Sequence, residues 1–422
     1  MTPPQVLLLE AAGPESRALA AAATASGCHV HAVTDPATYA TYAPDLKGLL
    51  AGRLLTDFSR PKHALDDVVG YARRIGAEAV LTVNEYLTVL LAHACAALNL
   101  PGNDPDRAMA ARNKAVMSAA FAAHGVATPR TWPVNDEEAL RRALATRQIS
   151  LPCVIKPAET AGSAGVTIAR SLAEATAAWR AAHKVRGMYG PPLTACVLAQ
   201  EYMEGTEFSV ESLTQDGTTT HLCTTAKTVT SGVHRVETGH TLPVNLPPHL
   251  EQAIRRQVEQ SIAAAGIRNG ASHTEVILSP DGRCTVIEIA ARLGAGHIGF
   301  LIQHALGIDP WAALIDTALG RPANLIPTRH EYATVRFLTS PRPGHLVAVH
   351  GLPRPSPSVP TVRLRTSPGE AVEVPRANRE RLGYFIVTGP DAASVDSRAE
   401  DLLAQITIDV APTQTSGCEG GT

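Results

Sequence analysis

Several features are scarce in this sequence, and each absence removes a class of protein. The seven cysteines of the 422-residue chain are scattered, with no Cys-x-x-Cys pair among them. That pattern gives no zinc site and is typical of a protein in a reducing cytoplasm. No apolar run approaches the roughly 20 residues needed to cross a bilayer. The N-terminal segment lacks the basic region of a signal peptide, so we expect a cytoplasmic protein with no membrane partner.

Excess charge of either sign is also missing. The formal net charge is −2, with 45% hydrophobic and 18% charged residues, which is ordinary for a globular protein. This balance gives no reason to expect a nucleic-acid partner. Lysine is scarce, since the chain has six among its 37 basic residues. A lysine is a compact charge that binds phosphate well, so each of the six is of particular interest.

Strands and helices alternate over residues 1–104, which predicts βαβ units and a parallel sheet. The expected strands are 6–10, 29–34 and 79–83, and the expected helices are 15–26, 61–74 and 87–98. No Gly-x-Gly-x-x-Gly follows the first strand, which argues against a dinucleotide-binding dehydrogenase. A chain of 422 residues exceeds what one core usually supports, so we expect two or three domains.

The rest of the chain predicts two further domains, one over residues 105–325, with a lobe at about 130–205, and a small α+β domain over 326–411. Helices are expected at 105–124, with Asp104 as a cap, and at 136–146, 249–265, 298–306, 310–319 and 392–405. Strands are expected at 151–156, 166–169, 195–203, 208–213 and 221–230 and in a hairpin at 272–290, and the segment 236–243 breaks this pattern. Residues 412–422 are small and polar, and we expect them to be disordered.

Two glutamates, Glu275 and Glu288, are the most informative residues. Between them Asp281-Gly282 separates two apolar runs, which predicts a β-hairpin. The hairpin would bring both carboxylates to one place, where they repel unless a cation or a proton lies between them. Oxygen ligands suit Mg²⁺, so we interpret the pair as a magnesium site, with a solvated hairpin as the alternative. His273 is assigned to the opposite face of this strand and, like the cysteines, to a structural role.

A loop of small residues follows the strand that ends at Lys156. It spans residues 158–166 and includes Gly162, Ser163, Ala164 and Gly165. The exposed backbone N–H groups of such a loop can wrap phosphates. It is not a Walker loop, which would lead into a helix through Gly-Lys-Ser/Thr. A plain flexible hairpin is the alternative.

Taken in order, these motifs resemble those of the ATP-grasp superfamily. The resemblance rests on Arg112-Asn-Lys114, on Lys156 with its loop, on Gln200-Glu201-Tyr-Met203 with Glu207, and on Glu275 and Glu288-Ile-Ala-Ala-Arg292. Each motif alone is weak, but the four together are specific and cover nearly the whole chain. The resemblance implies an α/β chain, α+β in the grasp domain. Its parts would be a Rossmann-like N-terminal domain, a two-lobed ATP-binding domain and a small C-terminal domain.

The resemblance also implies a role for each matching residue. The expected contacts to ATP are Lys114, Lys156, Gly162, Ser163, Ala164, Gly165, Gln200, Glu201, Met203 and Glu207. Of these, the lysines and the loop would hold the phosphates, and Glu207 would hold the ribose. Glu201 and Met203 would contact the adenine edge through their backbone C=O and N–H groups. The expected metal ligands and catalytic residues are Glu275 and Glu288, for Mg²⁺ with Mn²⁺ as an alternative, and Arg292 and Lys227. Arg292 would stabilise developing negative charge, whereas Lys227 has a surface strand position as its alternative.

Two positions depart from the family pattern. Many members have Glu where Gln200 stands, and more have Asn where Ala290 stands, two residues after the second metal Glu. One ligand of a second metal ion would then be missing, and water can replace it because Mg²⁺ readily keeps waters.

The segment Glu237-Thr-Gly-His240 resembles the L-amino acid ligase branch of the superfamily, in which such a Glu and His help to bind the amino acids. A connecting loop is the alternative. Asn84 and Glu85 follow a parallel strand, where ligands commonly bind, with a helix cap as their alternative. Gly294 would keep the pocket wall small. The expected substrate contacts are therefore Glu237, His240, Asn84, Glu85 and Gly294.

The resemblance implies an ATP-dependent carboxylate–amine ligase. It would join two amino acids, through an α- or a γ-carboxylate, by way of an acyl phosphate, and release ADP and phosphate. A homodimer and a place in natural-product biosynthesis are further expectations. The alternatives are a biotin-carboxylase-like or other ATP-grasp ligase of primary metabolism, and a nucleotide-binding protein without turnover. Gln200 and Ala290 motivate the last of these.

Overall fold

Four β-sheets organise the computed structural model, which describes residues 2–187 and 189–412. The first sheet is parallel, with the order β3-β2-β1-β4, as predicted for the N-terminal domain. Its strands are β1 (Gln5–Leu9), β2 (His29–Thr34), β3 (Leu50–Leu55) and β4 (Ala77–Leu81). Around it lie α1 (Pro14–Ala25), α2 (Pro36–Thr41), α3 (Pro44–Leu49), α4 (Pro61–Ile75), the 3₁₀ helix η1 (Glu85–Leu87) and α5 (Thr88–Leu98).

The second sheet forms the lobe predicted at about residues 130–205, which we call the lid lobe. It is antiparallel, with the order β5-β8-β6-β7. Its strands are β5 (Thr131–Pro133), β6 (Cys153–Pro157), β7 (Thr167–Ala169) and β8 (Val197–Glu201), and its helices are α7 (Glu137–Ala145) and α8 (Leu172–Lys184). The 3₁₀ helix η2 (Ala108–Ala111) and α6 (Lys114–Ala123) precede the lobe.

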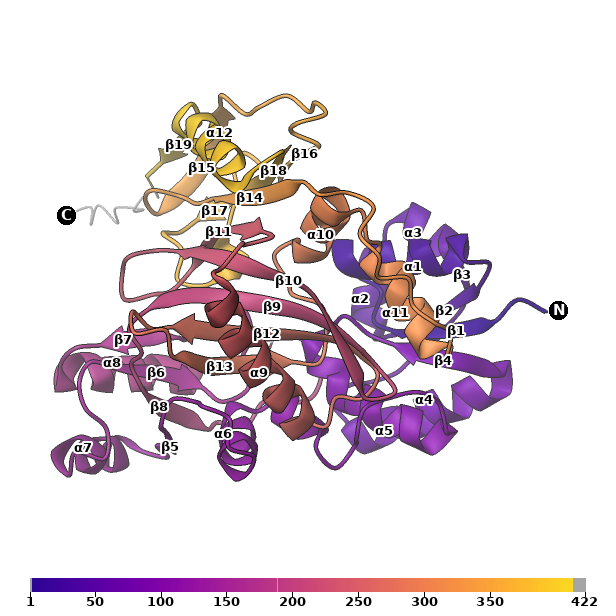
Figure 1. Cartoon of the computed structure of the whole chain (residues 1–422), viewed down its shortest axis with the longest axis horizontal. Helices are drawn as coiled ribbons and strands as arrows, with labels where there is room; N and C mark the ends of the chain where they lie inside the picture. The colour runs from indigo at the N-terminus through magenta and orange to yellow at the C-terminus, as the bar shows by residue number, and fades with distance from the viewer. Residues whose placement is uncertain (1, 188, 413–422) are drawn as a thin grey trace, which may run out of the picture.

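The third sheet has eight antiparallel strands and runs through the centre of the molecule (Figure 1). Its order is β13-β12-β9-β10-β11-β14-β18-β16. The strands are β9 (Thr206–Gln215), β10 (Thr218–Val229), β11 (Glu237–Leu242), β12 (Gly270–Leu278), β13 (Cys284–Ala290), β14 (Tyr332–Leu338), β16 (Thr361–Leu364) and β18 (Gly383–Gly389). Because β11 pairs with β14, continuous backbone hydrogen bonds join the central and C-terminal domains across the predicted boundary.

The fourth sheet, of order β17-β15-β19, lies in the C-terminal domain. Its strands are β15 (Gly344–His350), β17 (Ala371–Val372) and β19 (Thr407–Ala411), and the 3₁₀ helix η3 (Asn378–Glu380) and α12 (Ala392–Ala404) complete the domain. Helices α9 (Pro248–Ala264), α10 (Ile298–Leu306) and α11 (Pro310–Ala318) belong to the central domain. The predicted disordered tail lies almost wholly outside the described residues.

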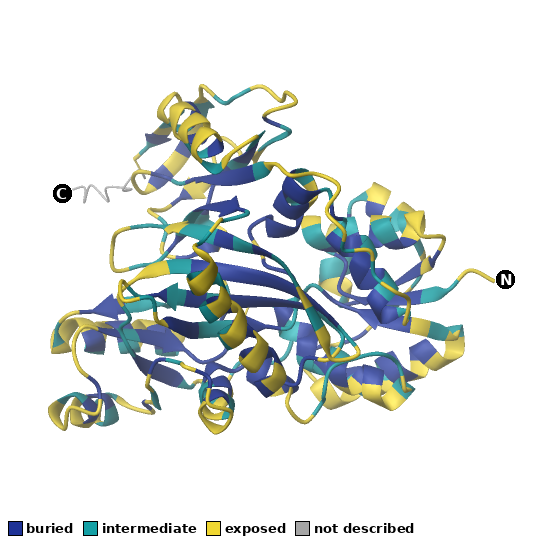
Figure 2. Ribbon diagram, viewed as in Figure 1, coloured by how far each residue is buried: buried dark blue, intermediate teal, exposed yellow. Residues whose placement is uncertain are grey.

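Helix α9 illustrates how the sequence pattern sets the packing. Its buried residues Ile254, Val258 and Ile262 recur every four positions, which places them on one face. That face packs on β12 and β13 among Val276 and Val286, whereas the opposite face is exposed (Figure 2). The helix therefore closes the core behind the hairpin of β12 and β13.

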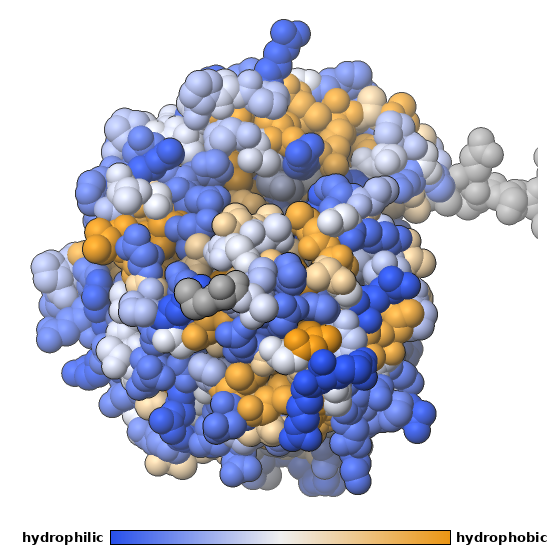
Figure 3. Space-filling model, turned by 90° about the vertical axis from the view of Figure 1, so that its right-hand side faces the viewer, coloured by the Kyte–Doolittle hydropathy of each residue, from blue (hydrophilic) through white to orange (hydrophobic). Residues whose placement is uncertain are grey.

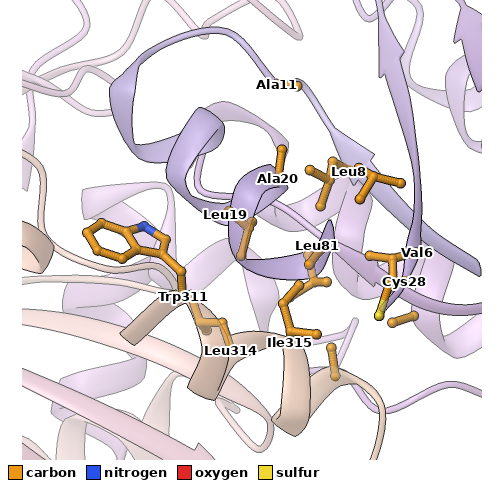
Figure 4. Close-up of a cluster of buried hydrophobic side chains, with 14 of the residues drawn as sticks. Val6, Leu8, Ala11, Leu19, Ala20, Cys28, Leu81, Trp311, Leu314 and Ile315 are labelled. Atoms are coloured by element: carbon orange, nitrogen blue, oxygen red, sulfur yellow. The ribbon is translucent and has the colours of Figure 1, made fainter. Parts of the chain in front are cut away.

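A buried apolar cluster joins the N-terminal domain to helix α11. Trp311, Leu314 and Ile315 of α11 lie against side chains of α1 and the parallel sheet, including Leu19 and Leu81 (Figure 4). Ile315 has no exposed surface. This contact fixes the carboxyl edge of the parallel sheet relative to the central domain, and that edge carries Glu85.

Two predicted elements are wrong. The single helix expected at 105–124 is interrupted, because the side chain of Asn113 accepts hydrogen bonds from the N–H groups of Ala115 and Val116 and starts a new helix at Lys114. The segment 236–243 does not break the strand pattern but forms β11, whose hydrogen bonds to β10 and β14 outweigh its polar composition. Prediction also missed α2, α3, β3, β5 and α8.

The distribution of apolar side chains on the surface and the burial of the free cysteines are those expected of a globular protein with this composition. On the face seen in Figure 3, apolar side chains form separate patches among hydrophilic ones. Six cysteines lie in the described part of the chain; all are free and five are buried. In that same part, no single helix has the length and apolar character to cross a membrane, and one bent pair, α10 with α11, passes by length and composition alone.

The α11 cluster predicts a loss of stability that can be compared with a matched control. Ile315→Ala removes fully buried methyl groups and leaves a cavity, so the free energy of unfolding should fall by about 2–5 kcal/mol. Ile326, which is 75% exposed, supplies the control, and Ile326→Ala should change stability by less than about 0.5 kcal/mol. Urea titration followed by tryptophan fluorescence measures both. Equal midpoints for the two variants would contradict the packing described.

Candidate active site

One cavity between the lid lobe and the eight-stranded sheet collects most of the residues singled out from the sequence. The predicted residues that line it are Glu85, Lys114, Lys156, Gly162, Ser163, Gln200, Glu201, Met203, Glu207, Lys227, Glu237, His240, Glu275, Glu288 and Arg292. Asn84, Ala164, Gly165 and Gly294 are not among the lining residues. The lining comes from all three domains, since Asn378 of the C-terminal domain also reaches the cavity.

Glu275 and Glu288 stand directly opposite each other on β12 and β13, as the predicted hairpin requires. Glu275 Oε1 lies 2.6 Å from Lys227 Nζ, and Glu288 Oε1 lies 2.8 Å from Lys114 Nζ. Burial alone would raise the pKa of Glu275, but the Lys227 ammonium holds it well below its usual range. The two carboxylates therefore face one cavity with a cation beside each.

The same pair fits a magnesium site in its donor chemistry. Within residues 2–187 and 189–412, no group of three or more His, Cys, Asp or Glu side chains is arranged to hold a metal. Ala290, opposite His273 in the ladder, offers no side-chain oxygen. Mg²⁺ commonly binds through one or two carboxylates and completes its shell with phosphate oxygens and water. Glu275 and Glu288 suit that mode.

Lys227 lies at the centre of the acidic residues. Its side chain is 2% exposed, and its Nζ is 2.6 Å from Glu275, 3.0 Å from Glu237 and 3.3 Å from Glu207. Burial alone would lower the pKa of Lys227, but the three carboxylates raise it well above its usual value. The surface-strand alternative for Lys227 is thus wrong, and this ammonium neutralises part of a partly buried acidic cluster.

Lys156 and Lys114 form a cationic wall next to the carboxylates. Both are buried. Burial and the nearby Lys114 charge lower the pKa of Lys156 to about 8. Lys114 Nζ also donates to the carbonyl of Thr160, 2.7 Å away, which links the start of α6 to the small-residue loop. Phosphate groups would relieve the repulsion between these two ammonium groups.

The loop between β6 and β7 has the backbone shape that its small residues allow. Gly162 and Ser163 both have positive φ, at 63° and 61°, so consecutive residues are left-handed. Gly165 also has positive φ, and a Cβ there would lie 2.9 Å from Val185. Gly162 and Ser163 line the cavity, whereas Gly165 packs against β6.

The end of the cavity expected to hold adenine and ribose is formed by β8 and the chain after it. Gln200 Nε2 donates to Thr131 Oγ1 at 2.8 Å, which fixes the side chain that departs from the family pattern. Glu201 pairs with Arg130 through its side chain, at 3.2 Å. Glu207 lies 3.6 Å from Arg235, a lining residue that the sequence reading missed.

Arg292 is held by Glu85 from the N-terminal domain. Its Nε donates to Glu85 Oε2 at 3.1 Å, and a second nitrogen donates to the same oxygen. Burial opposes the charge of Arg292, but Glu85 raises the pKa of the guanidinium. The side chain of Asn84 caps η1 by accepting from the N–H of Tyr86, which is the helix-cap alternative. Substrate contact by Asn84 stays a prediction.

The position predicted for His273, on the face of the strand opposite Glu275, is wrong. Residues 273 and 275 are two apart, so they share one face of β12 and do not lie on opposite faces. His273 Nε2 is 3.3 Å from Glu275 Oε1, and Nδ1 is 2.5 Å from Glu211 Oε1. Burial would lower the pKa of His273, but Glu211 raises it to about 9. Glu211, which has no exposed surface, was missed.

Gly294 has a different role from the one predicted. Its N–H donates to Glu211 Oε2 at 2.9 Å. A Cβ at this position would lie 2.7 Å from His273 Nδ1 and 3.0 Å from Glu211 Oε1. The glycine therefore allows the Glu211–His273 pair to approach the backbone, and it does not form the wall of the cavity.

Glu237 and His240 lie on β11 and line the same cavity. His240 Nε2 is 3.4 Å from Glu237 Oε2, and its buried ring meets Phe337 edge-on. Burial opposes the charge of Glu237, but Lys227 holds its pKa well below the usual range. An ionised carboxylate beside an imidazole can receive an ammonium group.

Comparison with known proteins gives three matches along the chain. An ATP-grasp N-terminal domain matches residues 20–102, an ATP-grasp domain matches 149–300, and the L-amino acid ligase C-terminal domain 2 matches 336–411. A solved L-amino acid ligase from Bacillus licheniformis superposes with a TM-score of 0.80 and 20% identity, and the match covers 97% of this chain and 100% of that chain.

Two curated relatives extend this comparison. Alanine–anticapsin ligase of Bacillus subtilis is 27% identical over 64% of this chain and 60% of its own length. Dapdiamide A synthase of Enterobacter agglomerans is 29% identical over 58% of each protein. The chain thus spans less than two thirds of the length of these relatives. The three domain matches follow one another along the chain. They show that this chain belongs to the ATP-grasp superfamily and carries the C-terminal domain of its L-amino acid ligases.

Proposed function

We propose that this chain is an ATP-dependent carbon–nitrogen ligase that joins two amino acids through an acyl phosphate. The observation that carries the proposal is the meeting of Glu275 and Glu288 with Lys114, Lys156 and Arg292 in one cavity. Phosphoryl transfer depends on positioning and electrostatic stabilisation more than on covalent protein chemistry, and this set of side chains supplies both. The relatives named as a ligase and a synthase support the same reaction class.

The chain's own residues would hold the triphosphate in place. Lys114 and Lys156 provide two buried positive charges, and the left-handed Gly162 and Ser163 turn the loop over them. Glu275 and Glu288 would bind Mg²⁺, which when present neutralises phosphate charge and orients the transferred group. Lys114, which pairs with Glu288 at 2.8 Å, would then be free to contact phosphate oxygens.

The amino acids would lie between Arg292 and β11. Arg292 is held in one orientation by Glu85, so its remaining donors can bind a carboxylate and the anionic oxygen of the tetrahedral intermediate. Glu237 and His240 offer an acceptor to an ammonium group. Activating a carboxylate by phosphorylation gives it a good leaving group, and the amine of the second amino acid then displaces phosphate.

A pairwise screen tests this proposal. The protein is incubated with MgATP and every pair of the 20 protein amino acids, and released phosphate and product mass are measured. We expect phosphate release that depends on an amino acid pair, with a product equal to the two amino acids minus one water. Bicarbonate-dependent ADP formation without amino acids would contradict the proposal, as would ATP binding with no release for any pair or for other amine acceptors.

A variant of Glu288, one of the two proposed magnesium ligands, tests whether the activity arises in this cavity. Glu288→Gln removes one negative ligand and should slow phosphate release on the order of 100-fold, because metal stabilisation is worth several kcal/mol. Glu251 on α9 serves as the control, since its pair with Arg255 is on the surface and contributes little. Glu251→Gln should keep the wild-type rate, and an unchanged rate in Glu288→Gln would contradict the metal assignment.

Nucleotide affinity should depend on pH through Lys156. With a pKa of about 8, its amine is charged below pH 8 and neutral above, and the phosphates favour the charged form. The affinity for Mg²⁺–adenylyl imidodiphosphate should therefore fall above pH 8, by at most about tenfold per pH unit. Calorimetric titration between pH 7 and 9.5 measures the fall.

Two variants isolate that effect. Lys156→Arg keeps its charge throughout this range and should flatten the dependence, whereas Lys184→Arg, at an exposed position, should leave it as in wild type. The same fall of affinity in Lys156→Arg would show that another group is responsible.

A further inference from the structure

Asn378 is the residue that brings the C-terminal domain into the cavity. Among the lining residues that the structure describes, it alone follows residue 325. It begins the 3₁₀ helix η3 and is 7% exposed. No motif in the sequence pointed to it, and its contacts join two parts of the site.

The side chain of Asn378 binds Glu237 through two hydrogen bonds. Asn378 Oδ1 accepts from the backbone N–H of Glu237 at 3.0 Å, and Nδ2 donates to Glu237 Oε2 at 2.8 Å. The amide uses both its acceptor and its donor on one residue, so it fixes the direction of the carboxylate. A leucine or an aspartate could not satisfy both groups.

The backbone of Asn378 binds the loop between β6 and β7. Its N–H donates to the carbonyl of Gly162 at 3.0 Å, and a Cβ on Gly162 would lie 3.7 Å from the Asn378 Cβ. Gly162 is the left-handed residue at which the loop turns over the cavity. One residue thus contacts the proposed phosphate loop with its main chain and the proposed ammonium site with its side chain.

The turn that carries Asn378 is itself firmly held. Glu380 Oε2 accepts from the N–H groups of Arg376 and Ala377, at 2.6 and 3.2 Å. Arg381 Nε donates to the carbonyl of Asn378 at 2.7 Å, and its guanidinium lies 3.7 Å from the centroid of the Phe337 ring. The turn is therefore one rigid unit, in which the backbone N–H and the side-chain amide of Asn378 keep their relative positions.

We propose that Asn378 is a positioning residue that couples nucleotide binding to amino acid binding. When the loop closes over phosphates, the hydrogen bond from the Asn378 N–H to the Gly162 carbonyl fixes the position of η3. The Asn378 amide then orients the Glu237 carboxylate to accept an ammonium group. Such a link is reciprocal, because each ligand strengthens the binding of the other by the same factor. The inference rests on the proposed function, since it takes the loop as the phosphate site and Glu237 as the ammonium site.

The coupling is measured without turnover. The dissociation constant of Mg²⁺–adenylyl imidodiphosphate is determined by calorimetry alone and with an equimolar mixture of the 20 protein amino acids. In the wild type the mixture should strengthen nucleotide binding at least about fivefold. In Asn378→Ala the gain should fall below about twofold, because Glu237 loses both hydrogen bonds. Binding of the nucleotide alone should stay within about threefold of wild type, since the loop contact uses the backbone.

Two further variants keep the test decisive if Asn378→Ala is poorly folded. Asn378→Asp preserves shape and the acceptor for the Glu237 N–H but sets carboxylate against carboxylate, so it too should lose the coupling. Asn324→Asp is the control, because Asn324 is exposed and uses its oxygen to accept from Ile326 N–H at 3.2 Å, which aspartate also does. It should couple as wild type does.

The outcomes separate this inference from the proposed function. Wild-type coupling in both Asn378 variants would overturn the inference, as would a wild type in which the amino acids leave nucleotide affinity unchanged. A parallel loss of nucleotide binding in both variants would also overturn it and indicate a purely structural role. If amino-acid-dependent phosphate release is present while the coupling is absent, only the role of Asn378 fails.

Discussion

Carboxylates that share a buried cavity repel one another, and the cavity of this chain places Glu207, Glu237 and Glu275 around a single ammonium, Lys227. The rest of the site follows from that constraint. Glu288 has Lys114 beside it, Glu275 also has His273, and Glu85 binds Arg292. Each of these acids thus has a basic partner from another segment of the chain, and Glu275 has a second one, His273, on its own strand.

The domains are joined so that these pairs can form. The eight-stranded sheet continues from β11 into β14 without a break, and α11 buries Trp311 and Ile315 against the N-terminal domain. Glu85 therefore reaches Arg292 from the carboxyl edge of the parallel sheet, and Asn378 reaches Glu237 from the C-terminal domain. The site depends on the relative position of three domains, which explains why its lining is spread along the whole chain.

Local patterns in the sequence predicted the parallel sheet and the hairpin that pairs Glu275 with Glu288, and the resemblance to the ATP-grasp superfamily predicted most of the other residues around the cavity. These predictions failed where contacts between residues distant in the sequence, or a helix cap, determine the local structure. The predicted helix at 105–124 is interrupted by the cap of Asn113, and the polar strand β11 is stabilised by neighbours on both sides. Glu211 and Asn378 are long-range partners that carry no local signal. His273 is different, since the two-residue period of a strand would have placed it beside Glu275.

In the proposed mechanism, a carboxylate is phosphorylated before the amine attacks. An amino acid with ¹⁸O in its carboxylate, given with MgATP and its partner amino acid, tests this directly by mass spectrometry of the phosphate. Because the carboxylate oxygen attacks phosphorus and leaves with it when the amide forms, each dipeptide should be accompanied by one phosphate that contains one ¹⁸O atom. Dipeptide formation with unlabelled phosphate, or with the label in AMP, would contradict the mechanism.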